Sequence, residues 1–528
     1  MYLLLIGLII GSIFVNSSFL TDSQILPKWV CFTIGITSMA FVLGWQLILR
    51  KHSNARKIKV MLYNVITTTI VIQAIYALCN YYNWWKQDVV FEIGSFDNPA
   101  GFSSCLCAGL PFVVLSTYAK SKWLQAMSYF CTVIVLIAIF VSKSRAGYIS
   151  CSATLISIYI FKYIKEGWKK HYLAIVLIIS LFIACLTMMN FQSPSKQNSM
   201  KGRKIIWNVG LNMIKDKPIF GHGLGSIEKS YMNYQSKYLQ NSSSESELML
   251  ADNIKHVFND YLAIAIQFGI TGIACLIVYI SLLIYCFKEK SHYFLGAQTS
   301  MSSMIGIAVF SCFSYPSYYP FTWTMIAINS YFIISPCITT MPRIFYKARS
   351  IIGLTLIVLS VLTALKVEKR LKAEIAWKKL NAKSLYLGNE NILNEYQALF
   401  HNMKKDPYFL YNYAAILHRE GLYSKSINIS KKCERYWTDY DLIMLMAYNF
   451  KELRKYSKAI EYFSNAEAMC PNRFEPIYNI MQIYKITGNS LQAINYAKQI
   501  INKPIKIYSS DINTIRDEAQ NVISTRGK

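Results

Sequence analysis

Acidic side chains are scarce in this sequence, which has 28 Asp and Glu against 55 Lys and Arg among its 528 residues. No DxD-type acidic cluster accompanies its apolar segments, and such a cluster is what nucleotide-sugar transferases use to hold a divalent metal. A Walker loop, a GxGxxG turn after a strand, an HExxH pair and an EF-hand loop are also missing. The sequence therefore predicts neither a metal site nor a cofactor.

The net charge of +27 at pH 7 could point to nucleic acid, but its distribution argues against that partner. Lys and Arg collect in short loops between apolar segments, which is typical of membrane proteins. No RRM, zinc-finger or helix-turn-helix signature accompanies them. We therefore exclude nucleic acid as a partner and predict that the chain is embedded in a lipid bilayer.

Apolar residues dominate the first two thirds of the chain. Hydrophobic residues make up 54% of the sequence and aromatic residues 14%, and the mean hydropathy is +0.28. Because a spanning helix needs about 20 apolar residues, about eleven spans are expected over residues 1–366. They are 2–20, 29–49, 60–80, 101–119, 124–142, 147–164, 172–190, 264–287, 295–313, 322–340 and 351–366. The predicted fold class is all-α, with a polytopic membrane helical bundle.

The positive charge also gives an orientation. Basic loops alternate along the chain with loops that carry no Lys or Arg, such as 21–27 and 314–321. The positive-inside rule places the basic loops in the cytoplasm. The large loop 191–263 and the C-terminal domain 367–528 are then expected on the outer side of the membrane.

The 13 cysteines fall mostly inside apolar segments, where they act as small hydrophobic residues. Only Cys433 and Cys470 lie in the polar C-terminal region. These two could form a disulfide if that region is periplasmic, and the sequence leaves the question open.

The C-terminal region is charged, rich in Tyr, and repeats with a period near 34 residues. Three segments align at Ser426, Ala459 and Ala493, which are 33 and 34 residues apart. Small residues there let the two helices of a tetratricopeptide-repeat hairpin approach closely. We predict an α-helical solenoid of about three such repeats, with a surface that can bind a protein partner. A plain helical bundle is the alternative.

Two outer segments carry candidate site residues. Arg145, in the sequence SKSRAG, follows the predicted span 124–142 on the outer face. A charge at the membrane edge is costly, so it suggests a function, although an Arg can also snorkel to the interface. The sequence EIGSFDNPAGF over 92–102 predicts a tight turn where the chain enters the membrane, with Asp97 as a candidate sugar contact.

The large loop carries a second isolated arginine. Arg203 opens a predicted helix that bears Trp207 four residues later, and a Gly-rich turn that includes Gly223 follows. A guanidinium group makes planar, bidentate, permanently charged contacts to phosphate. Lys204 adds a neighbouring point charge. The sequence therefore predicts an anion site with Lys204, Trp207 and Gly223 as substrate-binding residues.

These features resemble the O-antigen ligase and Wzy polymerase family of membrane glycosyltransferases over about residues 60–340. The SRAG sequence is similar to the family's SRG or SRA signature, and the order Arg, Trp, Pro–aromatic–Gly turn matches its loop. A further signature matches at Asn259, followed by nine residues and Gly-x-x-Gly at 269–272. The family has a His, proposed as the base or as a substrate-orienting group, where this chain has Phe258.

The resemblance implies direct, metal-independent glycosyl transfer from a glycan linked to undecaprenyl pyrophosphate. It also implies a multi-pass protein of the bacterial inner (cell) membrane, with the large loop and the C-terminal domain in the periplasm. Arg145 and Arg203 are expected to hold the pyrophosphate, and Asn259 is expected to bind substrate. Since Phe258 replaces the family His, three other residues are candidate bases, namely His256, His222 and Asp260.

The acceptor implied by the resemblance is lipid A-core in an O-antigen ligase, which we favour. It is a growing glycan in a Wzy-type polymerase, or a protein in an O-oligosaccharyltransferase. A polysaccharide transporter and a non-catalytic assembly scaffold are the alternatives from other classes.

Overall fold

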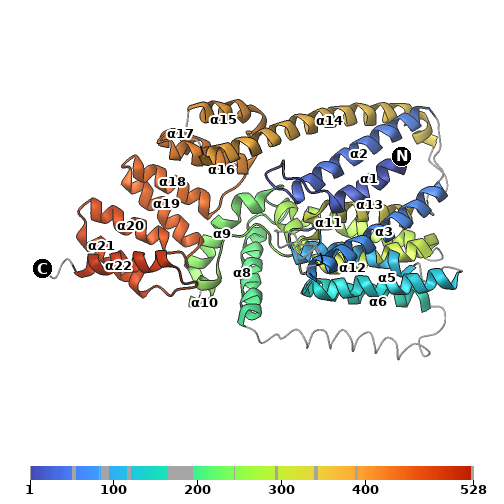
Figure 1. Ribbon diagram of the computed structural model, residues 1–528, viewed down its shortest axis with the longest axis horizontal. Coiled ribbons are helices and arrows are strands. Elements are labelled where there is room, and N and C mark those ends of the chain that lie inside the picture. Colours follow the sequence, from blue (N-terminus) through green and yellow to red (C-terminus); the bar gives the residue numbers. More distant parts are fainter. Residues whose placement is uncertain are drawn as a thin grey trace. The chain divides into compact units, whose positions relative to one another are not determined.

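A computed structural model describes residues 2–49, 55–82, 84, 94–115, 121–163, 194–242, 244–291, 295–337, 343–386 and 390–524. Every regular element in these ranges is helical, which confirms the all-α prediction (Figure 1). The chain forms two compact units. The first unit comprises Met1–Asn190, Phe258–Asp260 and Cys275–Lys378, and the second comprises Phe191–Val257, Tyr261–Ala274 and Lys379–Lys528.

The first unit contains the apolar helices. They are α1 (Tyr2–Phe14), α2 (Ile25–Ile48), α3 (Ala55–Tyr81), α4 (Pro99–Leu115), α5 (Lys122–Val141), α6 (Arg145–Tyr163), α12 (Leu295–Ser311), α13 (Pro320–Ile334) and most of α14 (Arg343–Tyr386). The short helices η3 (Phe287–Ser291) and η4 (Pro316–Tyr318) belong to it as well. Helix α11 (Asp260–Cys286) contributes to both units.

Helix α4 is the centre of the first unit. Nearly all of its residues are buried, and it packs against α3, α5, α6, α12 and α13. Its neighbours come close through small residues: a Cβ on Gly109 would lie 2.2 Å from Ile70 of α3. Small residues at helix contacts are how membrane helices gain van der Waals packing where lipid removes the hydrophobic driving force.

Five of the described helices are long and apolar enough to cross a membrane, so the chain is a multi-pass membrane protein. They are Ile25–Ile48, Lys57–Tyr81, Lys122–Val141, Asp260–Glu289 and Ala348–Ser384. These overlap the spans predicted at 29–49, 60–80, 124–142, 264–287 and 351–366. The total of about eleven stays a prediction, since the span expected at 172–190 lies outside the described residues.

The second unit joins the large loop to the C-terminal helices. From the loop come α8 (Pro194–Asp216), α9 (Ser226–Ser242), α10 (Glu245–Leu250) and the first part of α11. The C-terminal helices are α15 (Glu390–Met403), α16 (Pro407–Arg419), α17 (Tyr423–Cys433), α18 (Tyr440–Glu452), α19 (Tyr456–Met469), α20 (Glu475–Ile486), α21 (Ser490–Asn502) and α22 (Ser510–Ser524).

The C-terminal helices form three successive hairpins, α16–α17, α18–α19 and α20–α21, and α22 packs on the last of them (Figure 1). The small residues predicted to line the hairpins do so: Ser426 and Ala459 are fully buried, and Ala493 is 2% exposed. The Ser426 hydroxyl donates to the Ala414 carbonyl of the facing helix at 2.7 Å. The prediction of a tetratricopeptide-like helical solenoid is confirmed. Cys433 and Cys470 are buried free thiols.

Each hairpin has a residue in the left-handed conformation at the equivalent position of its turn. Gly421, Arg454 and Gly488 have φ values of 74°, 56° and 77° at the ends of α16, α18 and α20. In each turn the amide of the following residue donates to a carbonyl five positions back, as Lys455 does to Phe450 at 2.9 Å. This is the Schellman cap, which favours glycine because a Cβ is strained there. The middle repeat therefore carries a strained residue where its neighbours carry glycine.

We expect Arg454→Gly to stabilise the second unit. A non-glycine residue destabilises the folded state by about 1–2 kcal/mol in this conformation. Glycine removes that strain, but it loses more conformational entropy on folding, which costs about 0.5–1 kcal/mol. The net gain should be about 0.5–1 kcal/mol, seen as a higher midpoint of thermal unfolding of the full chain in detergent. Lys455→Gly is the control. Lys455 has a φ of −85°, so glycine relieves no strain there and should only destabilise the protein. A lower midpoint for Arg454→Gly than for wild type would contradict this account.

Candidate active site

The SRAG segment begins α6 with close packing against α4. The Ser144 hydroxyl accepts a hydrogen bond from the Gly147 amide at 3.2 Å, which caps the first turn of the helix. A Cβ on Gly147 would lie 2.8 Å from the Cβ of Ser103 in α4. Arg145, the first residue of α6, is half-buried. Its position is thus fixed by a cap and by a glycine contact in the first unit.

Helix α8 of the second unit presents Arg203 on a packed face. Arg203, Trp207 and Gly210 share this face, because residues three and four apart are neighbours on a helix. The Trp207 indole donates to the Val257 carbonyl at 3.1 Å, and a Cβ on Gly210 would lie 3.1 Å from Leu262 of α11. Arg203 itself is half-buried, whereas Lys204 is exposed. The face of α8 that bears Arg203 is therefore held against the start of α11.

The Gly-rich turn after α8 crosses the broken helix α11. Helix α11 is interrupted at Gly269, which has a φ of 61° and a ψ of −152° that only glycine adopts readily. A Cβ on Gly269 would lie 2.4 Å from the Ile219 carbonyl oxygen, and a Cβ on Gly221 would lie 2.4 Å from the Gln267 backbone. The two glycines thus allow these two segments of the chain to cross with their backbones in contact.

Four backbone hydrogen bonds fasten this crossing. They run from His222 to Ile266 (2.9 Å), Gly223 to Gln267 (2.9 Å), Ile270 to Pro218 (2.8 Å) and Thr271 to Ile219 (3.2 Å). The turn containing Gly223 and the Gly-x-x-Gly segment, both selected from the sequence, are therefore brought together.

The two candidate histidines of the loop differ in their roles. His222 Nε2 lies 2.8 Å from the Met213 carbonyl oxygen, and a carbonyl only accepts, so this nitrogen donates and ties the turn to α8. Burial, with the nearby Lys255 charge, lowers the pKa of His256 to about 4. His256 is neutral at pH 7 and is a weak base, because an effective base has a pKa near the working pH.

Phe258, Asn259 and Asp260 belong to the first unit and contact the C-terminal end of α12 and the connection from α12 to α13. Phe258 has a positive φ of 53°, and its ring lies 5.4 Å from that of Tyr315. The Asn259 amide donates to the Cys312 carbonyl at 3.0 Å. The Asp260 carboxylate is 8% exposed and accepts from the Ser317 amide (3.1 Å), the Ser317 hydroxyl (2.6 Å) and the Ser311 hydroxyl (3.1 Å). It holds the start of α11 to the α12–α13 connection.

Asp97 lies in the turn before α4, as the sequence predicts, and its side chain is exposed. Sequence reasoning missed the residues around it. Tyr319 donates to Asp97 at 2.8 Å. Lys28 is fully buried and donates to Asn16 Oδ1 (2.7 Å) and to the Gln24 (2.7 Å) and Ser95 (2.8 Å) carbonyls. The only signal for Tyr319 is its aromatic and proline-rich segment 314–321, and Lys28 lies next to an apolar run without any motif.

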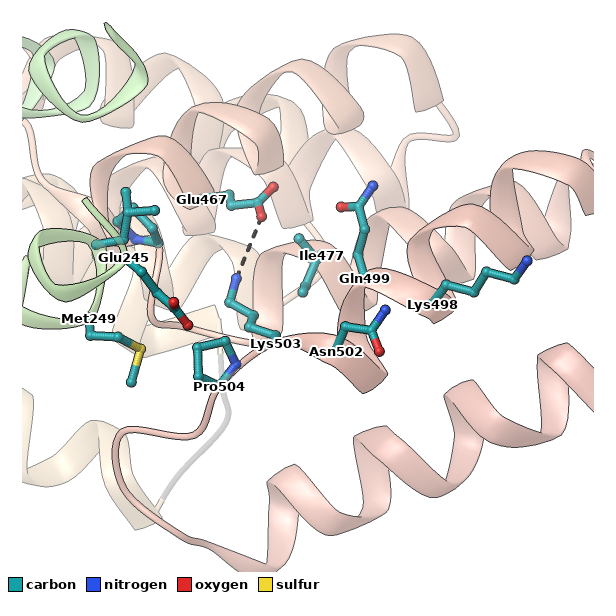
Figure 2. A pocket seen from close by; sticks show the side chains of 11 residues that line it. Glu245, Met249, Glu467, Ile477, Lys498, Gln499, Asn502, Lys503 and Pro504 are labelled. Carbon is teal, nitrogen blue, oxygen red and sulfur yellow. Dashed lines mark ion pairs between the residues drawn. The ribbon is translucent and has the colours of Figure 1, made fainter. Parts of the chain in front are cut away.

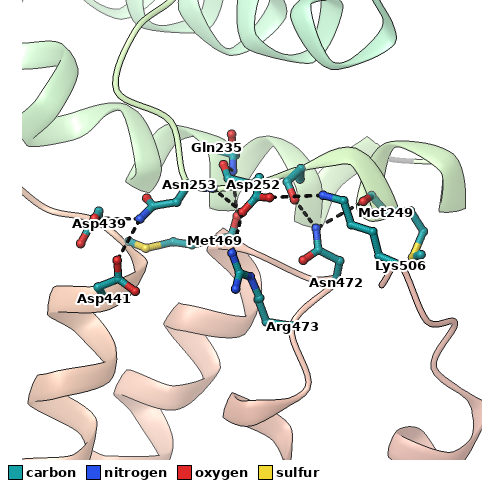
Figure 3. Close-up of polar contacts among 11 residues, drawn as sticks. Gln235, Met249, Asp252, Asn253, Asp439, Asp441, Met469, Asn472, Arg473 and Lys506 are labelled. Carbon is teal, nitrogen blue, oxygen red and sulfur yellow. Dashed lines mark hydrogen bonds and ion pairs between the residues drawn. The ribbon is translucent and has the colours of Figure 1, made fainter. Parts of the chain in front are cut away.

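A strap at residues 249–253 fastens the loop to the repeats (Figure 3). The buried Asn472 amide donates to the Met249 carbonyl at 3.3 Å and to the Ala251 carbonyl. The Gln235 amide, 1% exposed, donates to the Asp252 carbonyl at 3.0 Å and the Met469 carbonyl at 2.8 Å. Further contacts join Asp252 to Arg473 (3.0 Å) and Lys506 (3.3 Å), and Asn253 to Asp439 (2.8 Å).

A pocket of about 460 Å³ lies beside this strap, between α10 and the helices α19 to α21 (Figure 2). Apolar residues such as Leu248, Ile477 and Pro504 form much of its wall. The Lys503 ammonium lies 3.5 Å from the Glu467 carboxylate in it, and burial lowers the pKa of Lys503. The pocket lining includes none of the residues that the sequence predicted for catalysis.

The predicted site residues thus fall into two groups. Arg203, Lys204, Trp207, His222, Gly223 and His256 belong to the second unit, and Asp97, Arg145, Asn259 and Asp260 belong to the first. Within the second unit, the glycine crossing and the Trp207 bond bring the loop residues close to Tyr261–Ala274 of α11 and to Val257 before it.

Residues 130–277 match the family model described as O-antigen ligase. The match includes the SRAG segment, α8, the Gly-rich turn and the Gly269 break, and it covers less than half of the chain. The resemblance predicted from the sequence is confirmed over this domain. The protein therefore has a function of the membrane glycosyltransferase kind.

Solved structures give a weaker likeness. The crystal structure of yeast Tom70 is 10% identical, with 87% of this chain and 96% of that chain covered and a TM-score of 0.25. The crystal structure of the APC/C hetero-tetramer Cut9–Hcn1 is 12% identical, with 93% and 96% covered and a TM-score of 0.24. A TM-score this low does not establish a common fold. No curated protein matches the chain.

We expect Gly269→Ala and Gly221→Ala each to destabilise the loop by on the order of 3 kcal/mol, because a Cβ is strained in these conformations and meets backbone atoms. Gly202→Ala is the matched control, since nothing lies within 4 Å of its Cβ. Hydrogen exchange of residues 218–223 in the full chain measures the effect. Unchanged protection in both glycine variants would refute the crossing.

The strap contacts should differ in strength. Asn472→Ala should cost about 1–3 kcal/mol, because it leaves buried carbonyls without a donor. Arg473→Ala should cost less than about 1 kcal/mol, because the Arg473 and Asp252 side chains are 50% and 44% exposed. Faster hydrogen exchange of residues 245–257 in Asn472→Ala than in Arg473→Ala is the expected result, and the reverse order would contradict it.

Proposed function

We propose that this protein transfers a glycan from undecaprenyl pyrophosphate to an acceptor on the periplasmic face of the bacterial inner membrane, as an O-antigen ligase. The observation that carries the proposal is the position of Arg203 within the family-matched domain. Its helix is held by the Trp207 bond to Val257, and the turn that follows is fixed to α11 by four backbone bonds. A fixed cation is what a departing pyrophosphate requires.

The chemistry is a displacement at the anomeric carbon. The acceptor hydroxyl oxygen forms a bond to that carbon while the bond to the pyrophosphate oxygen breaks, so negative charge grows on the leaving group. Preorganised cations stabilise this charge more in the transition state than in the substrate. Arg203 and Arg145 are proposed for this role, since a guanidinium keeps its charge and binds phosphate through two parallel hydrogen bonds. The step needs no metal ion.

The acceptor distinguishes the related functions. Lipid A-core as acceptor makes the protein a ligase, a growing repeat-unit chain makes it a polymerase, and a protein makes it an O-oligosaccharyltransferase. The family match favours the ligase. A transporter and a non-catalytic scaffold are disfavoured, because the loop arginine and the SRAG segment have no role in either.

The repeat region is proposed to be periplasmic and to bind a protein partner. Its connections between hairpins are engaged by the strap, through Asp439, Asn472 and Arg473. The exposed residues of the repeats outside these connections are the candidate surface for that partner. A protein bound there would act close to the loop, because strap and repeats belong to the same compact unit.

Arg203→Ala and Arg145→Ala should each lower glycan transfer at least about 100-fold, because each removes a cation that stabilises the leaving group. Arg203→Lys keeps the charge without the bidentate geometry and should lose roughly tenfold. Arg435→Ala is the matched control, since Arg435 is an exposed arginine of the repeats. A deletion strain complemented with each variant is examined by lipopolysaccharide gel and whole-protein glycan blot, with equal amounts of membrane-inserted protein.

Free lipid-linked polymer with no long-chain lipopolysaccharide identifies the ligase. Single-repeat lipopolysaccharide identifies a polymerase, and loss of glycan from protein bands alone identifies an oligosaccharyltransferase. Wild-type glycan in both alanine variants would overturn the proposal.

A further inference from the structure

The turn that carries Asp97 is fixed from both sides. Gly94, with a φ of 66°, begins the turn, and Phe96 is fully buried. The Ser95 hydroxyl donates to the Ile13 carbonyl at 2.6 Å, and the Ser95 carbonyl accepts from the buried Lys28 ammonium at 2.8 Å. The residues that precede Asp97 in the turn are thus buried in the first unit, while Asp97 itself lies at the surface.

The Asp97 carboxylate is oriented by two neighbours. Tyr319 donates to Asp97 Oδ1 at 2.8 Å, and the Asn98 amide donates to Asp97 Oδ2 at 3.2 Å. Asn98 also donates to the Tyr319 oxygen at 2.6 Å and accepts from the Gly101 amide at 2.8 Å. Tyr319 is 1% exposed, and burial and the Asp97 charge raise the pKa of its phenol, so it remains a donor. An exposed carboxylate is therefore held in one orientation.

Further aromatic residues lie next to Tyr319, whose phenol binds this carboxylate. Tyr315 stacks on Tyr319 at 6.5 Å, and Tyr318 meets Tyr319 edge-on at 5.3 Å. Trp323 follows, 45% exposed, with its indole bonded to the Ser317 carbonyl at 2.7 Å. Rigid, partly exposed aromatic faces of this kind offer apolar area with little loss of side-chain freedom, and a sugar ring can pack on them.

Asp97 and Arg145 lie at the same end of the first unit. Helix α4 begins at Pro99, two residues after Asp97, and α6 begins at Arg145. The first turns of the two helices touch where Gly147 meets Ser103. A carboxylate and a guanidinium proposed for phosphate thus stand at adjoining helix starts.

We propose that Asp97 is the general base of the transfer, and that the acceptor group is a sugar hydroxyl whose ring packs on Tyr315, Tyr318 and Trp323. The proposal rests on the proposed function. The acceptor O–H proton passes to the Asp97 carboxylate as the oxygen bonds to the anomeric carbon. The electron pair of the broken bond leaves with the lipid pyrophosphate. His222 donates to the Met213 carbonyl and Asp260 is only 8% exposed, whereas Asp97 is exposed at the surface, so Asp97 is the better placed group.

The test uses the purified full chain in detergent, with undecaprenyl-pyrophosphate-linked glycan as donor and lipid A-core as acceptor. Asp97→Asn keeps the size and the hydrogen-bonding oxygen, and it should lower kcat about 10²–10⁴-fold with an unchanged donor KM. Tyr319→Phe removes the hydroxyl that donates to Asp97 and accepts from Asn98, and it should lower kcat roughly tenfold, again with an unchanged KM. Glu368→Gln is the matched control, because Glu368 is an exposed carboxylate of the same unit, paired with Lys372.

The outcomes separate the two claims. Wild-type kcat in Asp97→Asn, together with lost transfer in Arg203→Ala, would overturn the role of Asp97 and leave the proposed function standing. A loss of donor affinity in Asp97→Asn equal to the loss of kcat would also overturn it, because a base for the acceptor does not bind the donor. If the wild-type protein transfers glycan to none of the three acceptors (lipid A-core, glycan or protein), both the role of Asp97 and the proposed function are overturned.

Discussion

Two glycines, Gly221 and Gly269, join the turn after α8 to α11 within the second unit. Each has a left-handed φ, and a Cβ on either would lie 2.4 Å from the backbone of the opposing segment. The close approach permits four backbone hydrogen bonds between the turn after α8 and the broken part of α11. Helix α8, and with it Arg203, is therefore fixed to α11 by backbone geometry that no larger residue can reproduce. Such preorganisation matters in glycosyl transfer, because a cation already in place need not reorganise as charge develops.

The repeats add a second constraint on the same loop. Buried amides supply most of its strength, since Asn472 and Gln235 donate to strap carbonyls that have little access to water. The ion pairs of Asp252 with Arg473 and Lys506 are partly exposed, so they orient the Asp252 side chain but add little to the free energy of unfolding. Burial is opposed at Asp252 by the hydrogen bonds of Asn253 and Arg473 and by the Lys506 charge, and the pKa of Asp252 falls below its usual value. The strap thus stays anionic at neutral pH, with its cationic partners in place.

Much of this arrangement could be predicted from the sequence, and the reason is local chemistry. Spacing alone located Ser426, Ala459 and Ala493 in the repeats, because a helical hairpin needs small residues at a fixed period. The SRAG segment and the Gly-rich turn were recognised by their resemblance to the O-antigen ligase family, and the structure shows a cap at the first and left-handed φ values at the second. The contacts of Asp97 with Tyr319, of Lys28 with Ser95 and of Asn472 with Ala251 could not be predicted. Each joins residues more than 60 positions apart, and only the folded chain determines which ordinary polar side chains meet.

In the function proposed above, the protein transfers a glycan from a lipid pyrophosphate without a divalent metal. The most direct measurement follows release of undecaprenyl pyrophosphate by the purified wild-type chain, with lipid A-core present or absent and with excess chelator in the buffer. We expect undecaprenyl pyrophosphate to be released only when the acceptor is present, in an amount equal to the glycan transferred. The chelator should not change this release. Release without acceptor, or transfer that stops when divalent metal is removed, would contradict it.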